Sequence, residues 1–186
     1  MKRLKIIAYK RKLKHKTDYR KRIALLAGHM PRLVVRKSLR KIAVQLVDFG
    51  ANGDKVITSS SSLELKKHGW KYSFANLPAA YLTGLLIGNK ASKLNIKKAI
   101  LDLGLSRSVP GSSQYALVRG AIDSGLDVPC SKDVLPDESR ILGKHIAEYS
   151  KTAASDKQFS YYKKEGLSIA DMPKIVENLK SKLVKN

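Results

Sequence analysis

The sequence has little cysteine, few acidic residues near its start and no long apolar run. A single cysteine among 186 residues, Cys130, excludes an internal disulfide framework and a zinc site built from several cysteines, and it fits a reducing cytosol. The most apolar stretch, residues 74–88, is shorter than a bilayer requires and contains polar residues and a proline, so we expect a buried helix. The segment Ile6-Ile7-Ala8 is too short for the core of a signal peptide. These absences indicate a soluble, cytoplasmic protein.

Sequence motifs for catalysis are also missing. No metal-binding, phosphate-loop or nucleophile-elbow motif occurs, and the histidines are scattered at His15, His29, His68 and His145. Asp48 and Asp102 each end a predicted strand, and paired carboxylates at such positions hold two magnesium ions in ribonuclease-H-like nucleases. Aspartate is equally common where a strand leaves for a turn, and no third carboxylate is placed to join this pair. We expect no enzyme, metal, cofactor or small-molecule substrate, and keep an RNA-cleaving enzyme as the rival hypothesis.

Positive charge is concentrated at the N-terminal end. Residues 1–41 hold sixteen of the 37 lysines and arginines and one acid, Asp18, so they carry +15 of the formal +22. Tyr9, His15 and Tyr19 lie among these cations and offer rings that can stack on bases. Such a field is most easily neutralised by a polyanion, and the rings favour RNA. The alternatives are a solvated basic tail without a specific role and a basic scaffold for acidic proteins or membranes.

After residue 30 the pattern is that of an α/β domain. Residues 33–36, 42–47 and 55–59 predict three strands joined by short turns, which makes an antiparallel meander. Helix-start signals follow, first Ser61 with Glu64 as a capping box and then Asn76 before Pro78. Residues 98–103 are an apolar run that predicts a buried strand after a helix, so we expect this strand to run parallel to a neighbour.

The chain is expected to divide into a basic arm (residues 1–29), an α/β core domain (30–131) and a helical C-terminal extension (132–186). In the arm, Thr17 or Asp18 can cap a short helix, but residues 1–22 show no sustained period, so we expect disorder until a partner neutralises the charge.

Packing details of the core and the extension can also be predicted. Gly84 and Gly88, four residues apart, are expected to let their helix approach the sheet closely. Residues 128–130 are expected to form a short last strand, and one helix to run from Pro136 through Tyr149.

Several segments are similar to one known family. They are residues 16–22 (KTDYRKR), 31–38 (PRLVVRKS), 69–71 (GWK), 78–84 (PAAYLTG), 101–105 (LDLGL) and 120–126 (GAIDSGL). Together they resemble the archaeal large-subunit ribosomal protein L-eighteen family, whose eukaryotic counterpart also binds 5S rRNA. The resemblance runs from about residue 10 to residue 130, and beyond that it is to the extension of archaeal and eukaryotic members.

The resemblance implies a fold and a function. The fold would be a three-layer α/β domain with a mixed sheet, of the ribonuclease-H-like kind found in translational machinery components. Members of the family have no catalytic activity. They bind 5S rRNA through the basic arm and one face of the sheet domain and join it to large-subunit rRNA in the central protuberance. The implied partners are 5S rRNA, large-subunit rRNA and neighbouring large-subunit proteins, on cytoplasmic ribosomes.

The expected RNA contacts come from two sources. The matching motifs point to Lys16, Thr17, Asp18, Tyr19, Arg20 and Arg22 and then to the hairpin residues Arg36, Lys37 and Ser38. Charge and aromatic character add Lys2, Arg3, Lys5, Tyr9, Lys10, Arg11, Lys12, Lys14, His15, Arg32 and Arg40.

Overall fold

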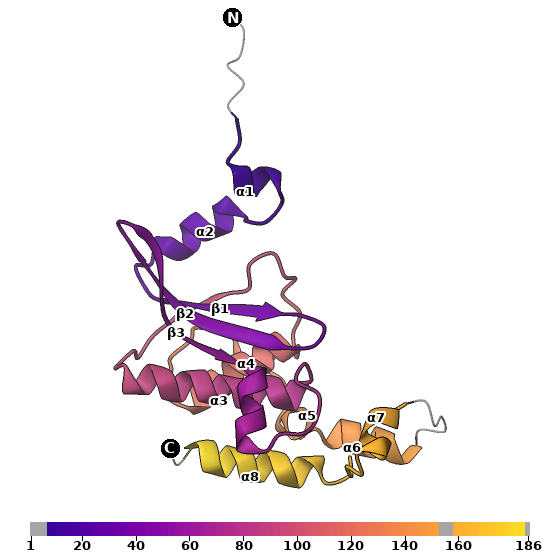
Figure 1. Ribbon diagram of the computed structural model, residues 1–186. Helices are drawn as coiled ribbons and strands as arrows, with labels where there is room; N and C mark the ends of the chain where they lie inside the picture. The colour runs from indigo at the N-terminus through magenta and orange to yellow at the C-terminus, as the bar shows by residue number, and fades with distance from the viewer. Residues whose placement is uncertain (1–6, 153–157, 185–186) are drawn as a thin grey trace, which may run out of the picture.

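A mixed four-stranded sheet forms the centre of the protein. The computed structural model describes residues 7–152 and 158–184 (Figure 1). The strands are β1 (Arg32–Lys37), β2 (Ile42–Gly50), β3 (Gly53–Ser61) and β4 (Ile100–Asp102), in the order β3-β2-β1-β4. β2 pairs antiparallel with β1 and β3, and β4 pairs parallel with β1. The predicted meander, the parallel fourth strand and the α/β class are confirmed.

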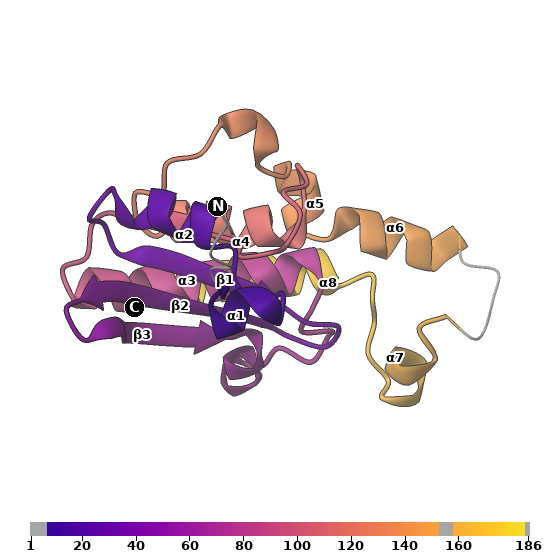
Figure 2. The same ribbon diagram turned by 90° about the horizontal axis from the view of Figure 1, so that it is seen from above.

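The two faces of the sheet differ in character because side chains alternate along each strand. One face is apolar and fully buried, with Leu33, Val35, Ile42, Val44 and Leu46 at 0% exposure. The helices α3 (Leu77–Lys93) and α4 (Ser113–Asp123) lie on this side (Figures 1 and 2). The opposite side, which we call the open face, carries Arg32, Val34, Arg36, Gln45 and Val47, which the register of β1 and β2 brings together.

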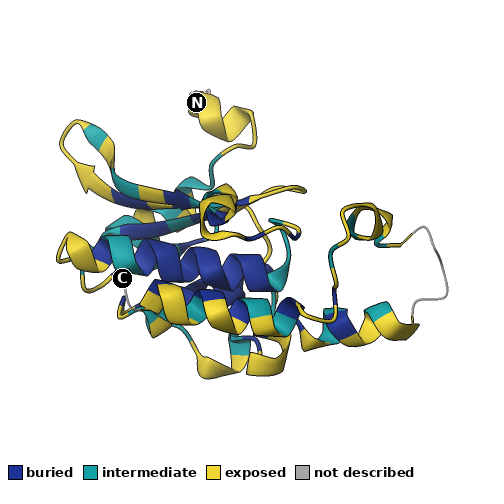
Figure 3. Ribbon diagram, turned by 60° about the horizontal axis from the view of Figure 1, so that its bottom comes forward, coloured by how far each residue is buried: buried dark blue, intermediate teal, exposed yellow. Residues whose placement is uncertain are grey.

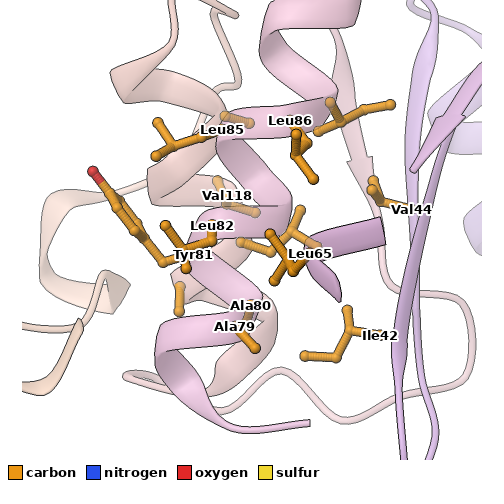
Figure 4. Packing of buried hydrophobic residues seen from close by; sticks show 14 of the residues in the cluster. Ile42, Val44, Leu65, Ala79, Ala80, Tyr81, Leu82, Leu85, Leu86 and Val118 are labelled. Atoms are coloured by element: carbon orange, nitrogen blue, oxygen red, sulfur yellow. The ribbon is translucent and has the colours of Figure 1, made fainter. Parts of the chain in front are cut away.

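Helix α3 is the central element of the core. Figure 4 shows its Ala80, Leu82 and Leu86 directed toward Ile42 and Val44 of the sheet and Leu65. Figure 3 shows α3 buried along most of its length. Its start is set locally, since Asn76 Oδ1 accepts a hydrogen bond from the Ala79 amide at 2.9 Å, with Pro78 in the first turn.

The glycines of α3 serve helix packing against α4 rather than against the sheet. A Cβ built on Gly84 would overlap the Leu117 carbonyl oxygen, and one on Gly88 would overlap the Ser124 side chain. The expected close approach is present, but its expected partner was wrong. The reason is that α4 carries its own glycine, Gly120, at the crossing, so two helix backbones can meet there.

The predicted capping box is confirmed and joins two elements. Glu64 Oε1 accepts from the Ser61 amide at 3.0 Å, and Ser61 Oγ accepts from the Leu63 amide at 3.4 Å. The helix that follows is a 3-10 helix, η1 (Ser62–His68), which ends at Gly69 in the left-handed region (φ 93°). Glu64 also pairs with Lys90 of α3 at 2.8 Å, so the cap is tied to the core helix.

The C-terminal part is helical, as predicted, but more broken than expected. Its elements are η2 (Lys132–Val134), α5 (Glu138–Ile141), α6 (Lys144–Thr152), α7 (Ser160–Lys164) and α8 (Met172–Val184). The single helix expected from Pro136 through Tyr149 is wrong, because Gly143 (φ 79°) separates α5 from α6. The strand expected at residues 128–130 is wrong. Just before it, Asp127 forms a single parallel β-bridge with Lys98. α8 packs on α3 through buried Val176 and Leu179 (Figure 1).

Two helices of the arm complete the described fold. They are α1 (Lys10–Leu13) and α2 (Tyr19–Leu26). Throughout the described ranges, every helix is too short or too polar to cross a bilayer.

Candidate nucleic-acid interface

From residue 7 onward the basic arm is folded by short-range contacts, in contrast to the expectation of disorder, and residues 1–6 lie outside the described residues. Asp18 caps α2 by accepting hydrogen bonds from the amides of Arg20 (3.0 Å) and Lys21 (3.2 Å). The Arg11 Nε donates to Thr17 Oγ1 at 2.7 Å, which closes the turn between α1 and α2. Each short helix is marginal alone, so these contacts and the docking of α2 hold the arm in shape.

Two aromatic rings join the start of α1 to the start of α2. The rings of Tyr9 and Tyr19 lie 5.0 Å apart, centroid to centroid, at an angle of 38°. Tyr9 remains 71% exposed, so it presents a ring surface to solvent while it braces the start of α2.

The arm and the open face enclose a cleft of about 1350 Å³. Figures 1 and 2 show α1 and α2 on the side of the sheet opposite α3. Arg11, Lys16 and Lys21 line the arm side, Gln45 lies on the sheet, and Arg107 lies in the loop after β4. The volume exceeds the roughly 300–1,000 Å³ of small-molecule pockets, and with its cationic walls it suits part of a large polyanion.

Five charged residues cross this cleft in a row of alternating sign. The row consists of Arg22, Asp54, Arg32, Asp102 and Arg36, and we call it the arginine–aspartate row. Arg22 donates two hydrogen bonds to Asp54, from Nη1 to Oδ2 at 2.9 Å and from Nη2 to Oδ1 at 2.8 Å. Arg32 bridges the two carboxylates, with 2.7 Å to Asp54 Oδ1 and 3.0 Å to Asp102 Oδ2. The row therefore connects α2 of the arm with β3, β1 and β4.

The last part of the row fixes the loop after β4. Asp102 Oδ1 accepts from the Gly104 amide at 2.8 Å, while Arg36 Nη1 donates to the Asp102 carbonyl oxygen at 2.9 Å. Gly104 adopts φ 62°, and a Cβ there would lie 2.9 Å from the Arg36 guanidinium carbon. Glycine is favoured at this position by its left-handed backbone conformation, and a side chain there would in addition displace the Arg36 guanidinium.

The pairing is reflected in the acidity of its members. The hydrogen bonds from Arg22 hold the pKa of Asp54 below its ordinary value, with Arg32 acting in the same direction, although partial burial opposes the shift. The same contact raises the pKa of Arg22. Asp54 is therefore ionised at neutral pH, and the row contains three cations and two anions.

The structure places most of the predicted contact residues on the exposed surface of the arm and hairpin. These are Tyr9, Lys10, Arg11, Lys12, Lys14, His15, Lys16, Arg20, Arg36, Lys37, Ser38 and Arg40. Thr17, Asp18, Tyr19 and Arg22 are half-buried where the arm folds and docks. Lys2, Arg3 and Lys5 lie outside the described residues. Direct RNA contact at each of these positions stays a prediction.

Arg32 differs from the other predicted contacts. It is 3% exposed and paired with Asp54 and Asp102, so in this conformation it stabilises the open face rather than presenting its guanidinium to solvent. Ser38 is also engaged, because its Oγ donates to the Lys41 carbonyl oxygen and accepts from the Lys41 amide, which shapes the β1–β2 turn. Leu39 at this turn is 98% exposed between cations.

Sequence reasoning did not single out three residues of the cleft. Lys21 and Arg107 add cations to its walls, and Asp54 adds a carboxylate to the sheet. Lys21 stands in the basic run, so charge alone could have found it. Arg107 and Asp54 come to the cleft through sheet pairing, and no local pattern marks them.

The rival nuclease site is contradicted by the strand register. Asp102 pairs through Val34 of β1 and lies on the open face, whereas Asp48 follows Val47 in β2 and points to the opposite side. Two carboxylates on opposite faces of a sheet cannot share a pair of metal ions. Among residues 7–152 and 158–184, no three His, Cys, Asp or Glu side chains gather in a metal-binding group.

Known proteins are similar to this chain over almost its whole length. A family model described as ribosomal large subunit proteins 60S L5 and 50S L18 matches residues 2–98. The large ribosomal subunit protein uL18 of Methanococcus maripaludis is 43% identical over 183 residues, which cover 96% of this chain and 95% of the relative. The protein of the same name from Korarchaeum cryptofilum is 46% identical over 174 residues, covering 91% and 87%.

Proposed function

The chain belongs to the family of large-subunit ribosomal proteins that comprises 60S L5 and 50S L18, and from this premise we propose that it binds 5S rRNA and joins it to large-subunit rRNA in the central protuberance. As a member, it is a structural, non-enzymatic component of the cytoplasmic ribosome's large subunit.

The position of the arm over the open face is the structural observation that supports this proposal. α1 and α2 lie over the open face and line a cleft together with it (Figure 1). Arg11, Lys16 and Lys21 of the arm therefore line one cleft with Arg36 of the sheet and Arg107 of the following loop. A surface of this kind fits a folded polyanion.

The mechanism follows from the types of side chain present. Lysines such as Lys12 and Lys16 displace counterions from RNA phosphates, which makes the affinity depend steeply on salt. Arg20 provides a fork that matches two phosphate oxygens or a guanine edge. The exposed ring of Tyr9 stacks on an unpaired base or packs on a ribose.

The arm hypothesis is tested by removing charge at matched positions. One variant replaces Lys10, Lys12, Lys14 and Lys16 with Gln, and its control replaces Lys144, Lys151, Lys174 and Lys182, all exposed in the C-terminal extension. Both lose four charges. We expect the arm variant to reduce the slope of log affinity for 5S rRNA against log salt by about three, and the control to change it by less than one.

A similar slope in both variants would refute the arm as the RNA-binding element. Deleting residues 1–22 extends the test, and we expect a folded domain with a much smaller slope. The identity of the partner is tested separately, by sequencing the RNA that co-purifies with the chain from its own cells. Anionic vesicles that compete as well as 5S rRNA would favour a membrane scaffold instead.

A further inference from the structure

Asp54 is an unusual residue for a cationic cleft. It is a carboxylate in a cleft that Arg11, Lys16, Lys21 and Arg107 also line, and its side chain keeps 35% of its surface exposed. A carboxylate near bound phosphates repels them, so a residue of this kind lowers RNA affinity unless it does something else. Its contacts indicate what it does.

Asp54 holds the arm at a defined place on the sheet. It receives both arms of the Arg22 guanidinium, a two-point contact that fixes orientation as well as distance. The Arg22 guanidinium carbon also lies 5.9 Å from the centre of the Phe49 ring. Phe49 and Asp54 are register partners at the end of the β2–β3 hairpin, so this hairpin end makes two kinds of contact with the Arg22 guanidinium.

The anchor itself is rigid because it rests on a buried group. Asp54 Oδ1 accepts from Arg32 at 2.7 Å, and Arg32, 3% exposed, is held from its other side by Asp102 at 3.0 Å. Asp54 is thus held by Arg32 through Oδ1, while Arg22 of α2 contacts both of its carboxylate oxygens. The sheet therefore provides a fixed attachment point for α2 of the arm.

We propose that Asp54 is a positioning residue for RNA binding, which fixes α2 over the open face so that the cations of the arm form a preformed surface. The inference rests on the proposed function, because it concerns the same RNA. Arg20 and Lys21 stand on the same helix as Arg22 and are exposed, so anchoring Arg22 also sets where these two cations stand. A preformed site avoids the free energy needed to order the arm on binding.

The proposal and simple electrostatics predict effects of opposite sign. If Asp54 only repels phosphate, replacing it with Asn tightens RNA binding. If it positions the arm, the same change weakens binding, because the arm occupies its binding-competent place for a smaller fraction of the time. The slope of affinity against salt changes little in the second case, since no phosphate contact is removed.

The experiment measures affinity of the full chain for 5S rRNA at several salt concentrations. We expect Asp54→Asn to weaken binding about five- to tenfold and to keep the salt slope. This loss corresponds to a variant whose arm is docked about a tenth to a fifth of the time, because the apparent Kd rises by the reciprocal of that fraction. Asp54→Glu, which retains the carboxylate, should bind within about twofold of the unchanged protein. The matched control is Asp48→Asn, since Asp48 is an exposed carboxylate of the same hairpin that accepts only from the Phe49 amide among the described contacts.

A second readout follows the arm itself. Amide hydrogen exchange in residues 23–27 of the free protein should be faster in Asp54→Asn than in the unchanged protein and in Asp48→Asn. Equal or tighter RNA binding by Asp54→Asn overturns the proposal, as does weaker binding with unchanged exchange in α2. An equal loss in Asp48→Asn also overturns it. By contrast, failure of the unchanged protein to bind 5S rRNA at any of these salt concentrations would defeat the proposed function itself.

Discussion

Gly84 of α3 and Gly120 of α4 face each other where the two helices cross. A Cβ on Gly84 would lie 3.0 Å from the Gly120 Cα, and a Cβ on Gly120 would lie 3.1 Å from the Gly84 Cα. Each would also overlap a backbone carbonyl oxygen of the other helix, that of Leu117 or Tyr81. The absence of a side chain at both positions is what allows α4 to pack directly against α3.

Gly84→Ala should therefore destabilise the protein by about 3 kcal/mol, because the two backbones must separate to admit the methyl group. In an open helix the same change stabilises by about 1 kcal/mol, so the sign is diagnostic. Urea unfolding measures the difference. Gly50→Ala is the control, since a Cβ there meets nothing within 4 Å, and we expect a change within about 0.5 kcal/mol. A stabilising Gly84→Ala would contradict the packing described.

Asp102→Asn should cost about 3 kcal/mol, because it removes a carboxylate from Arg32 while the guanidinium stays buried. Thermal or urea unfolding provides the measurement. Asp127→Asn is a fitting comparison, since its pair with Lys98 is long at 3.7 Å and well exposed, and we expect a loss below about 0.5 kcal/mol. Equal losses in the two variants would show that burial of the Arg32–Asp102 pair is irrelevant.

The stability of the protein should fall between neutral pH and mild acid through His145. Burial lowers the pKa of this imidazole below 6.5, with Arg140 acting in the same direction and Glu148 opposing it. Below pH 6.5 the unfolded chain binds a proton that the folded chain resists, so the free energy of unfolding decreases until the pH reaches the lowered pKa. His145→Gln should flatten this part of the curve. Urea unfolding of both proteins at several pH values measures this curve, and an unchanged pH dependence in His145→Gln would contradict the role of His145.

Arg20→Ala should weaken binding of 5S rRNA and reduce the salt slope by about one, because one phosphate contact is lost. Lys174→Ala should leave both quantities unchanged, since Lys174 lies on α8, beyond the sheet and α3 from the arm (Figure 1). Filter binding or fluorescence anisotropy at several salt concentrations measures both. An equal change at Lys174 would mean that overall charge, rather than the arm, determines the slope.

Local signals in the sequence were enough for most elements of the fold. Asn76, Ser61 and Asp18 start helices because a side-chain oxygen within three residues satisfies free amides, and such contacts can be read from spacing. The strands could be predicted in the same way, since period-2 alternation places Ile42 and Val44 on one buried face.

The parts that escaped prediction depend on residues far apart in the chain. The contact of α2 with the sheet includes the pair between Arg22 and Asp54, which are 32 residues apart, and nothing near Arg22 in the sequence indicates its partner. Gly84 was expected to pack against the sheet. Its actual partner, Gly120, belongs to a later helix, and the local sequence around Gly84 does not indicate it. Likewise, Gly143 adopts a left-handed backbone conformation that ends α5, although the apolar pattern around it is that of one continuous helix.

The pair between Arg32 and Asp102 spans 70 positions, and this spacing has a consequence for the newborn chain. At roughly 5–20 residues per second, translation delivers the carboxylate about 4 to 14 seconds after the guanidinium. During that interval β1 lacks its parallel neighbour and Arg32 lacks the carboxylate of Asp102. The basic arm is thus synthesised before the arginine–aspartate row that joins it to the sheet can be completed.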